Sequence, residues 1–463
     1  MLFNSLEFLV FFLIVLVLYY SLPHKFRWIL ILLASCLFYM AYKPIYILVL
    51  FAVILIDYIA ALFIENINDP KKKKLLLLLS LFSNIGILAY FKYYDFIFEN
   101  ISLLLSSLGS HKKFQLLELV LPVGLSFHTF QSMAYTIEVA KGKQKAEKHL
   151  GYFASYVLFF PQMVAGPIEK YSSLGVQLRN KIVYQYENFS HGFRLVLYGL
   201  LIKVVIADTI SRIPDKIFGN PSLFSSYDTW IAVLLFSIQI YADFFGYSTI
   251  AVGLARCMGI NLMDNFNHPY FSYSIPDFWK RWHISLTSWF REYVYFPLGG
   301  SRVKKWKWIL NILLVFSLSG LWHGASWNFV WWGLIHGFLY LVEKPLDKVK
   351  ITKIMMLPMI LLNFVILSLV WVFFRSPDIK TTKLIFSKLF SNETTDEKLY
   401  LPWDFWGVLL LFIALELLFR KKRIDVFFDD KNSFIRWGFY SIMIFIIYLW
   451  SDINPKAFIY FKF

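Results

Sequence analysis

Two histidines are the residues of this sequence best suited to chemistry, because both stand among apolar segments. His323 lies in LWHGASWN (321–328), and His283 lies in the most concentrated polar stretch of the chain, 277–300. Ionisable side chains at membrane depth are costly, and those that occur usually mark a functional site. An imidazole with an ordinary pKa near about 6.5 is suited to moving protons. We therefore interpret His323 as a catalytic base in a transmembrane tunnel; the alternative is a core histidine bonded to a carbonyl.

Three neighbours of His323 are secondary candidates. Trp322 could line the tunnel, although aromatic packing or anchoring at the membrane interface is the simpler interpretation. Asn328 could hydrogen-bond within the cavity, and His336 fits a supporting partner and a core residue equally well. We interpret His128, in SFHTF, as a core residue.

The segment around His283 predicts an amphipathic helix that starts at Pro276 and Asp277. Its apolar residues fall on one stripe at helical spacing, and its bases lie elsewhere on its surface. Such a helix could lie in the membrane interface with its bases at lipid headgroups. The stripe consists of Trp279, Trp282, Leu286, Trp289 and Phe290.

The elements that position these residues must be membrane helices. The chain is 58% hydrophobic and only 16% charged, against roughly 45–50% and about 25% for a soluble domain. Apolar runs near the length that crosses a bilayer, about 20 residues, predict an all-α polytopic membrane protein with roughly a dozen transmembrane or re-entrant helices. The clear runs are Leu6–Leu22, Trp28–Tyr42, Ile45–Ile64, Leu75–Phe91, Trp230–Leu254, Trp308–Leu321, Phe329–Val342, Ile354–Phe374, Phe405–Phe419 and Trp437–Trp450.

The net charge of +16 does not indicate nucleic acid, because the bases cluster in short loops between the apolar runs. This distribution follows the positive-inside rule and places those loops in the cytoplasm, with the amino terminus outside. We expect the first run to be retained as a span rather than cleaved. The isolated Cys36 and Cys257 predict neither a disulfide framework nor a metal site. The clusters are Lys25 with Arg27, 71–74, 141–148 and 421–423.

We expect one integral membrane domain over residues 1–463. Residues 1–110 form plain spans, 120–345 a catalytic core, and 346–463 further spans and a tail. Proline, glycine and polar residues interrupt the helices of the middle region, as in LPVG (121–124) and GP (166–167). Broken helices at membrane depth are tolerated only where they are buried in protein or line a cavity, so the site should lie there.

The motifs of this middle region resemble those of the membrane-bound O-acyltransferase superfamily, and in particular its bacterial alginate O-acetyltransferase branch. The resemblance rests on 278–300 and 319–328, and on PVGLSF (122–127), FFPQMVAGPI (159–168) and DFFGYS (243–248). The chain is also similar to peptidoglycan O-acetyltransferases and to membrane proteins of teichoic acid D-alanyl transfer. The resemblance implies a bundle of helices around a central tunnel.

The resemblance also implies roles for individual residues. His323 matches the near-invariant catalytic histidine of the superfamily, and His283 matches its partner position. The end of the chain, FIYFKF (458–463), fits F-x-Y-x-x-F and resembles a terminal motif whose tyrosine, here Tyr460, carries the acyl group between compartments. A phenyl ester would divide one hard transfer into two easier ones. The alternative is an aromatic tail at the membrane interface.

The expected donor is acetyl-coenzyme A, used as a substrate, with no permanently bound cofactor and no metal. The chain has no glycine loop of a known phosphate-binding type. The phosphates of acetyl-coenzyme A could be held by the cytoplasmic bases Lys280, Arg281, Arg291 and Arg302. Positive-inside topology explains the same residues without a ligand.

The expected function is therefore transfer of an acetyl group across a bacterial inner membrane, in which the protein sits as a multi-pass component in contact with lipid. Its partners would be an extracytoplasmic transferase of the SGNH type or an esterase-like protein, and a polysaccharide acceptor such as alginate or peptidoglycan; no nucleic acid is expected. One alternative is D-alanyl transfer from a carrier protein to teichoic acid. A second is a transporter, whose common folds carry internal repeats; we find none in this sequence.

Overall fold

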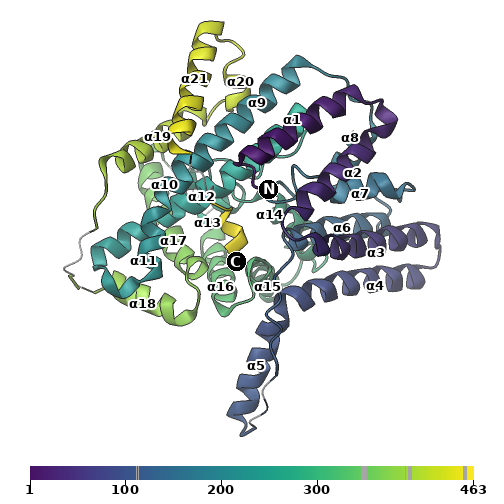
Figure 1. Cartoon of the computed structure of the whole chain (residues 1–463). Helices are drawn as coiled ribbons and strands as arrows, with labels where there is room; N and C mark the ends of the chain where they lie inside the picture. The colour runs from purple at the N-terminus through teal and green to yellow at the C-terminus, as the bar shows by residue number, and fades with distance from the viewer. Residues whose placement is uncertain are drawn as a thin grey trace. The chain divides into compact units, whose positions relative to one another are not determined.

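The structure is a computed structural model that describes residues 1–110, 112, 114–345, 352–391, 393–394, 399–451 and 456–462. Helices form all the regular secondary structure of these residues, and no strand occurs among them (Figure 1). The predicted all-α class is confirmed.

The clear apolar runs all lie in helices. Five helical stretches of the described chain are long and apolar enough to cross a membrane: Pro44–Asn66, Pro70–Ser107, Ser226–Cys257, Ile354–Arg375 and Ser433–Trp450. A shorter apolar helix is α1. The helices that contain the runs are α1 (Leu6–Ser21), α2 (His24–Met40), α3 (Ile47–Asn66), α4 (Pro70–Leu88), α12 (Ser226–Cys257), α15 (Lys305–His323), α16 (Trp327–Glu343), α17 (Lys353–Arg375), α19 (Trp403–Phe419) and α21 (Ser433–Trp450).

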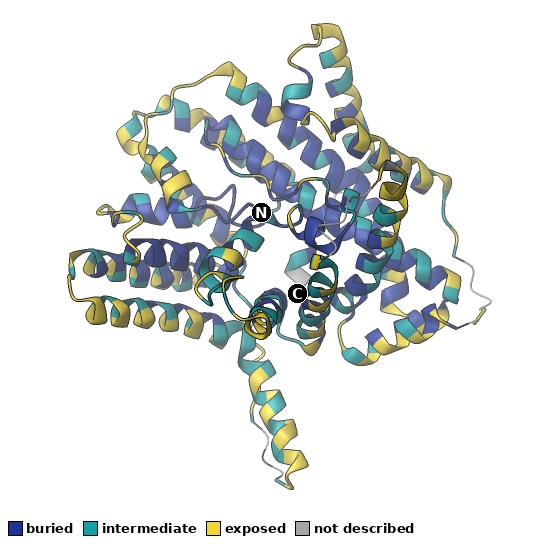
Figure 2. Ribbon diagram, turned by 180° about the vertical axis from the view of Figure 1, so that it is seen from behind, coloured by how far each residue is buried: buried dark blue, intermediate teal, exposed yellow. Residues whose placement is uncertain are grey.

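Exposed residues follow several of these helices (Figure 2), and many of them are apolar. Leu79 and Phe82 on α4 and Phe445 on α21 are each more than half exposed. Contiguous apolar surface of this kind marks a surface that contacts protein or membrane. On helices of spanning length, it is the surface that lipid would cover.

The chain divides into two compact units, and the first contains residues 6–185 with 258–262. Its centre is α6 (Leu125–Ala140), which packs on α3 and α4 and is buried along nearly its whole length. His128 on α6 is buried, and its Nδ1 lies 2.8 Å from the carbonyl oxygen of Val157. His128 is therefore a core residue, as expected from the sequence. The remaining helices are α5 (Tyr94–Ser107), α7 (Leu150–Val157) and α8 (Val176–Arg179).

The second unit contains residues 2–5, 186–257 and 263–463, and includes both candidate histidines. Its central element is α12, which is mostly buried and packs along α9 (Tyr186–Leu200). The expectation of one domain with a core at 120–345 stays a prediction. The shorter helices of this unit are α10 (Asp208–Ile210), α11 (Arg212–Gly219), α13 (Ile275–Trp279), α14 (Ile284–Phe290), α18 (Ile379–Leu389) and α20 (Ile424–Phe427).

Two glycines allow α15 and α16 to pack at close range. A Cβ at Gly320 would overlap the backbone of Phe329, and a Cβ at Gly333 would overlap the backbone of Phe316. Small residues at such a contact let helix backbones approach closely. The hairpin of α15 and α16 thereby fixes the end of α15, where His323 is the last residue.

Candidate active site

His283 lies in a tight turn between two short helices. Ser274 caps α13 by accepting a bond of 3.2 Å from the backbone N–H of Asp277, and α13 ends at Trp279. His283 itself has a φ of 42°, in the left-handed region that non-glycine residues rarely adopt. The start predicted at Pro276 and Asp277 is close to the observed one. The continuous amphipathic helix is wrong, because the helix is interrupted at residues 280–283, between the end of α13 and the start of α14.

The apolar stripe of that segment is buried inside the protein. Trp282 is 1% exposed and Leu286 is 2% exposed. The stripe therefore packs into the protein core rather than into the membrane interface. The same burial applies to Trp279, Trp289 and Phe290.

Asn265 holds the turn that carries His283. Its carbonyl oxygen accepts a bond of 2.9 Å from the N–H of Ile284, and its Oδ1 accepts a bond of 2.6 Å from the hydroxyl of Ser285. Its amide in turn donates to the hydroxyl of Ser248 on α12, at 3.2 Å. Residues held in rare backbone conformations persist only where their surroundings fix them, and they cluster at functional sites. Sequence reasoning missed Asn265, because only the folded chain places it beside 283–285.

The two histidines lie close together inside the second unit. Their ring centroids are 6.4 Å apart, and His283 and His323 are 1% and 5% exposed. Trp322 lies beside both, with its ring 4.9 Å from His323 and 6.1 Å from His283. Phe244 on α12 lies 4.8 Å from His283. The motif DFFGYS therefore supplies one wall of the site, a role that sequence reasoning did not assign.

Burial keeps the imidazole of His283 uncharged. It lowers the pKa of His283 to about 3, because the charged form is disfavoured away from water. Neutral imidazole has one nitrogen that can accept a proton and one that can donate a hydrogen bond. At neutral pH, His283 can therefore donate a hydrogen bond to a carbonyl and polarise it.

The carboxyl-terminal tail returns to the helices of the second unit (Figure 1), and its Tyr460 lies beside His323. The ring of Tyr460 lies 5.6 Å from His323 and 4.8 Å from Phe244, centroid to centroid, and its phenolic oxygen is buried. Phe458 is fully buried and stacks 5.2 Å from Tyr460. Tyr460 thus lies within the protein, beside the catalytic candidates. The last residue of the F-x-Y-x-x-F motif, Phe463, lies outside the described residues.

The other two candidates near His323 are placed further from the pair. Trp332 lies between His323 and His336, at 5.2 Å and 4.8 Å from their rings, and His336 is fully buried among aromatic side chains. Asn328 donates a bond of 2.8 Å to the carbonyl oxygen of Ser376. The contacts of His336 and Asn328 are therefore those of core residues that fix α16.

Among the four basic candidates, Arg291 borders a cavity. This cavity of about 140 Å³ is mostly apolar and is also lined by Thr287 and Ser319. Lys280 and Arg302 are exposed, and Arg281 pairs with Asp277 at 3.1 Å.

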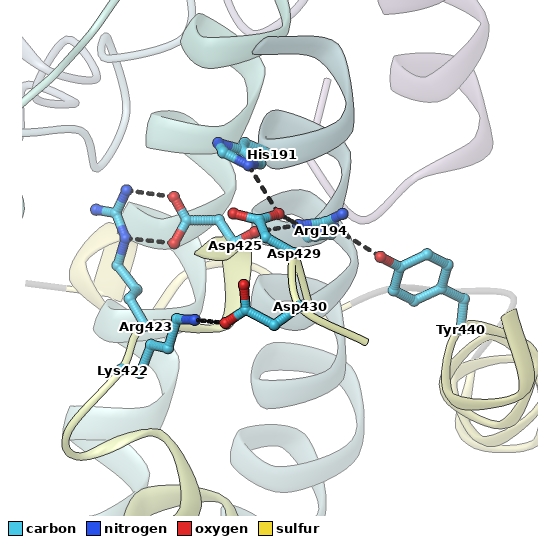
Figure 3. Close-up of polar contacts among 8 residues, drawn as sticks. All are labelled: His191, Arg194, Lys422, Arg423, Asp425, Asp429, Asp430 and Tyr440. Carbon is cyan, nitrogen blue, oxygen red and sulfur yellow. Dashed lines mark hydrogen bonds and ion pairs between the residues drawn. The ribbon is translucent and has the colours of Figure 1, made fainter. Parts of the chain in front are cut away.

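A polar cluster elsewhere in the second unit ties α9 to α20 and α21 (Figure 3). Arg194 is buried and donates to the carboxylate of Asp429 at 2.5 Å and to the hydroxyl of Tyr440 at 2.6 Å. Arg423 binds both oxygens of Asp264, at 2.8 and 2.7 Å. Asp264 directly precedes Asn265, so this cluster supports the loop that holds the turn at His283.

The arrangement of Tyr460, His323 and His283 suits acyl transfer. A hydroxyl nucleophile activated by an adjacent imidazole is the usual arrangement for covalent catalysis, and a second imidazole can hold or polarise the carbonyl that is attacked. Here Tyr460 and His283 both contact Phe244, and His323 lies beside Tyr460, so that one phenol and two imidazoles are close together.

Comparison with known proteins gives a family match in the region of the histidines. Residues 147–374 match the MBOAT, or membrane-bound O-acyltransferase, family. The match contains His283 and His323 and ends before the tail.

Similar proteins extend over most of the chain. It is 34% identical over 398 residues to a probable alginate O-acetylase of Pseudomonas aeruginosa, covering 85% of this chain and 76% of that protein. It is 35% identical over 380 residues to a peptidoglycan O-acetyltransferase of Helicobacter pylori, covering 76% and 71%. A teichoic acid D-alanyltransferase of Bacillus subtilis is 33% identical over 238 residues, covering 47% and 57%.

Proposed function

Because this chain belongs to the membrane-bound O-acyltransferase family, and is thus a multi-pass membrane acyltransferase, we propose that it moves acetyl groups from cytoplasmic acetyl-coenzyme A across the membrane. The acceptor is an extracytoplasmic polysaccharide, as the names of the alginate and peptidoglycan relatives suggest. The observation that carries the proposal is the placement of Tyr460 beside His323 and of His323 beside His283.

The proposed reaction has two transfers. In the first, His323 accepts the phenolic proton of Tyr460 while the phenolic oxygen attacks the thioester carbonyl, and His283 orients or polarises that carbonyl. The C–S bond breaks, and the leaving thiolate takes the proton from His323. In the second, an acceptor hydroxyl attacks the phenyl ester and regenerates the phenol. General-base help in such steps is typically worth about 10²–10⁴-fold in rate.

The cavity beside Arg291 supports entry of the donor from the cytoplasm. Thr287 and Ser319 line it, and each lies about one helical turn from His283 or His323, respectively. A mostly apolar space that Arg291 borders suits the arm that carries a thioester. Lys280, Arg281 and Arg302 would then act on the donor phosphates from the same cytoplasmic side.

The course of α21 supports transfer of the acyl group to its acceptor on the extracytoplasmic side. The basic residues 421–423 lie on the cytoplasmic side by the positive-inside rule, so α21, which runs from Ser433 to Trp450, leads to the extracytoplasmic side. A polar cavity of about 540 Å³ lies there, lined by Asp208, Arg212 and Lys456 among others. We propose that an SGNH-type or esterase-like partner, or the polysaccharide itself, meets the acyl group on this side of a bacterial inner membrane.

D-alanyl transfer remains the second candidate. It would use the same residues with a different thioester donor on a carrier protein. The share of this chain that matches the D-alanyltransferase is 47%, against 85% for the alginate relative. This difference favours acetyl, and family membership favours catalysis over the transporter alternative.

Purified protein with acetyl-coenzyme A labelled in the acetyl group tests the proposal. We expect wild type to retain label on Tyr460, identified by peptide mapping, and the Tyr460→Phe variant to retain none there. Tyr448→Phe removes an exposed tyrosine of α21 and should label as wild type does. Equal labelling of wild type and Tyr460→Phe would exclude the relay, and a wild type that releases no thiol from the donor would exclude acetyl transfer from acetyl-coenzyme A.

A further inference from the structure

A buried ionic cluster lies directly beside the tail. The backbone N–H of Ile459 donates to one carboxylate oxygen of Asp243 at 2.6 Å, and the other oxygen pairs with Lys203 at 2.6 Å. Lys203 also pairs with Asp208 at 2.7 Å. The side chains of Lys203 and Asp243 are only 2% and 4% exposed. We refer to Lys203, Asp208 and Asp243 as the tail seat.

Close packing of two helices builds this seat. A Cβ at Gly199 on α9 would overlap the backbone of α12 at Gly246 and Ile250. After Gly199, the chain continues into the π-helical segment Leu201–Ala207, which contains Lys203. Segments of this type are frequent at functional sites. The glycine contact brings Lys203 on this segment to Asp243 on α12.

The tail completes the charge of the seat. Lys203, Asp208 and Asp243 together supply one cation and two carboxylates, and buried charges are costly unless they are paired. Lys456 adds a second cation: its ammonium donates to the carbonyl oxygen of Asp208 at 3.0 Å and to the hydroxyl of Ser211 at 2.9 Å. The tail therefore brings both a positive charge and a backbone donor.

Aromatic contacts place the phenol once the tail is bound. Phe458 packs against Tyr247 and Phe244, with centroids 4.9 and 5.4 Å away. Phe244 directly follows Asp243 and contacts the rings of both Tyr460 and His283. Ile459, whose N–H bonds to Asp243, directly precedes Tyr460, so a shift at this bond moves the phenol.

We propose that Asp243 and Lys203 are positioning residues that, with the anchor Lys456, hold the tail so that the phenol of Tyr460 lies at His323. The effect of this positioning on catalysis rests on the proposed function, whereas the binding of the tail to the seat does not. Loss of the seat should free the tail and slow formation of the phenyl ester, with the donor still bound.

Hydrogen–deuterium exchange of the full-length protein tests the seat without any chemistry. We expect amides of 456–462 to exchange at least about tenfold faster in Asp243→Ala and in Lys456→Gln, with α15 and α16 unchanged. Lys456→Arg keeps the charge and should restore protection. Asp404→Asn changes a carboxylate that lines the same polar cavity as Lys456 and Asp208, and the tail of this variant should exchange as in wild type.

Labelling with acetyl-coenzyme A gives the second readout. We expect the rate of label transfer to Tyr460 to fall at least about tenfold in Asp243→Ala and Lys456→Gln, with the KM for the donor unchanged and Lys456→Arg near wild type. If Asp243→Ala does not fold, Lys456→Gln alone still tests the proposal.

Unchanged exchange of the tail amides in Lys456→Gln would contradict binding of the tail by the seat. Faster exchange with an unchanged labelling rate would overturn its role in positioning. If wild type takes no label, the proposed function fails and the exchange result still decides whether the seat binds the tail.

Discussion

The phenol of Tyr460 and the imidazole of His323 lie side by side, with ring centroids 5.6 Å apart, although one belongs to the carboxyl-terminal tail and the other to the end of α15. Phe244 on α12 contacts the rings of both Tyr460 and His283, and His323 lies beside each of these two residues. A nucleophile and a base are thereby brought together from distant parts of the chain.

Replacement of His323 should abolish most of the thioester turnover. We expect His323→Ala to lower the release of free thiol from acetyl-coenzyme A by about 10²–10⁴-fold, since general-base help is lost. His149→Ala changes an exposed histidine and should keep the wild-type rate. Full turnover by His323→Ala would exclude its role as the base.

The left-handed backbone at His283 predicts which substitutions at this position the fold tolerates. Asparagine accepts the left-handed region readily and β-branched residues do not. His283→Asn should therefore melt close to wild type, whereas His283→Val should melt about 1–2 °C lower, because the left-handed conformation costs about 1–2 kcal/mol per residue and a chain of 463 residues loses about 1 °C per kcal/mol. Both variants should turn over more slowly. Thermal unfolding in detergent measures the difference, and equal melting of the two variants would contradict strain at this turn.

Packing of α15 against α16 makes Gly320 sensitive to a single methyl group. We expect Gly320→Ala to destabilise the protein by about 1–3 kcal/mol, as overpacking usually does, and to lower turnover through displacement of His323. Gly438→Ala on α21 meets open space and should be neutral or stabilising by up to about 1 kcal/mol. A melting temperature for Gly320→Ala at or above that of Gly438→Ala would argue against the close contact.

Acid should remove the stabilising effect of Asp429. Burial alone would raise the pKa of Asp429, but hydrogen bonds from Arg194 and His191 outweigh it and hold this pKa below its ordinary value of 3.8. A carboxylate with a lowered folded pKa stabilises the fold above its unfolded pKa, and this contribution is lost as the pH falls through the folded value.

The gap in melting temperature between wild type and Asp429→Asn should thus be constant from about pH 8 to pH 5 and shrink below about pH 4. Asp430→Asn is the matched control, because Asp430 pairs with Lys422 at the exposed surface (Figure 3) and such pairs contribute little. A gap for Asp429→Asn that widens in acid would contradict the direction of its pKa.

Much of the helical architecture could be predicted from the sequence, because apolar runs of spanning length leave few alternatives to a helix. The start of α13 near Pro276 was predicted for a related reason, since local capping chemistry determines it. The break at His283 was not, because it depends on bonds from Asn265 to Ile284 and Ser285, and a contact between distant residues leaves no periodic pattern.

The same distinction applies to the site. His323 and His283 could be selected from residue type, apolar setting and motif resemblance. Phe244, Asp243 and Lys203 could not, because their positions at the site follow from how α9, α12 and the tail pack together. His336 and His323 fall on neighbouring helices, and only the structure places Trp332 between them.

The attachment of Tyr460 to the same chain as the histidines has a kinetic consequence. A tethered nucleophile is present at an effective concentration set by the tether rather than by the abundance of the protein. If the phenol attacks the donor, the first transfer is unimolecular in the enzyme–donor complex, and its rate should not change when the protein is diluted in the membrane. Each molecule also carries one such phenol, so a full turnover loads one acyl group before the next donor can react.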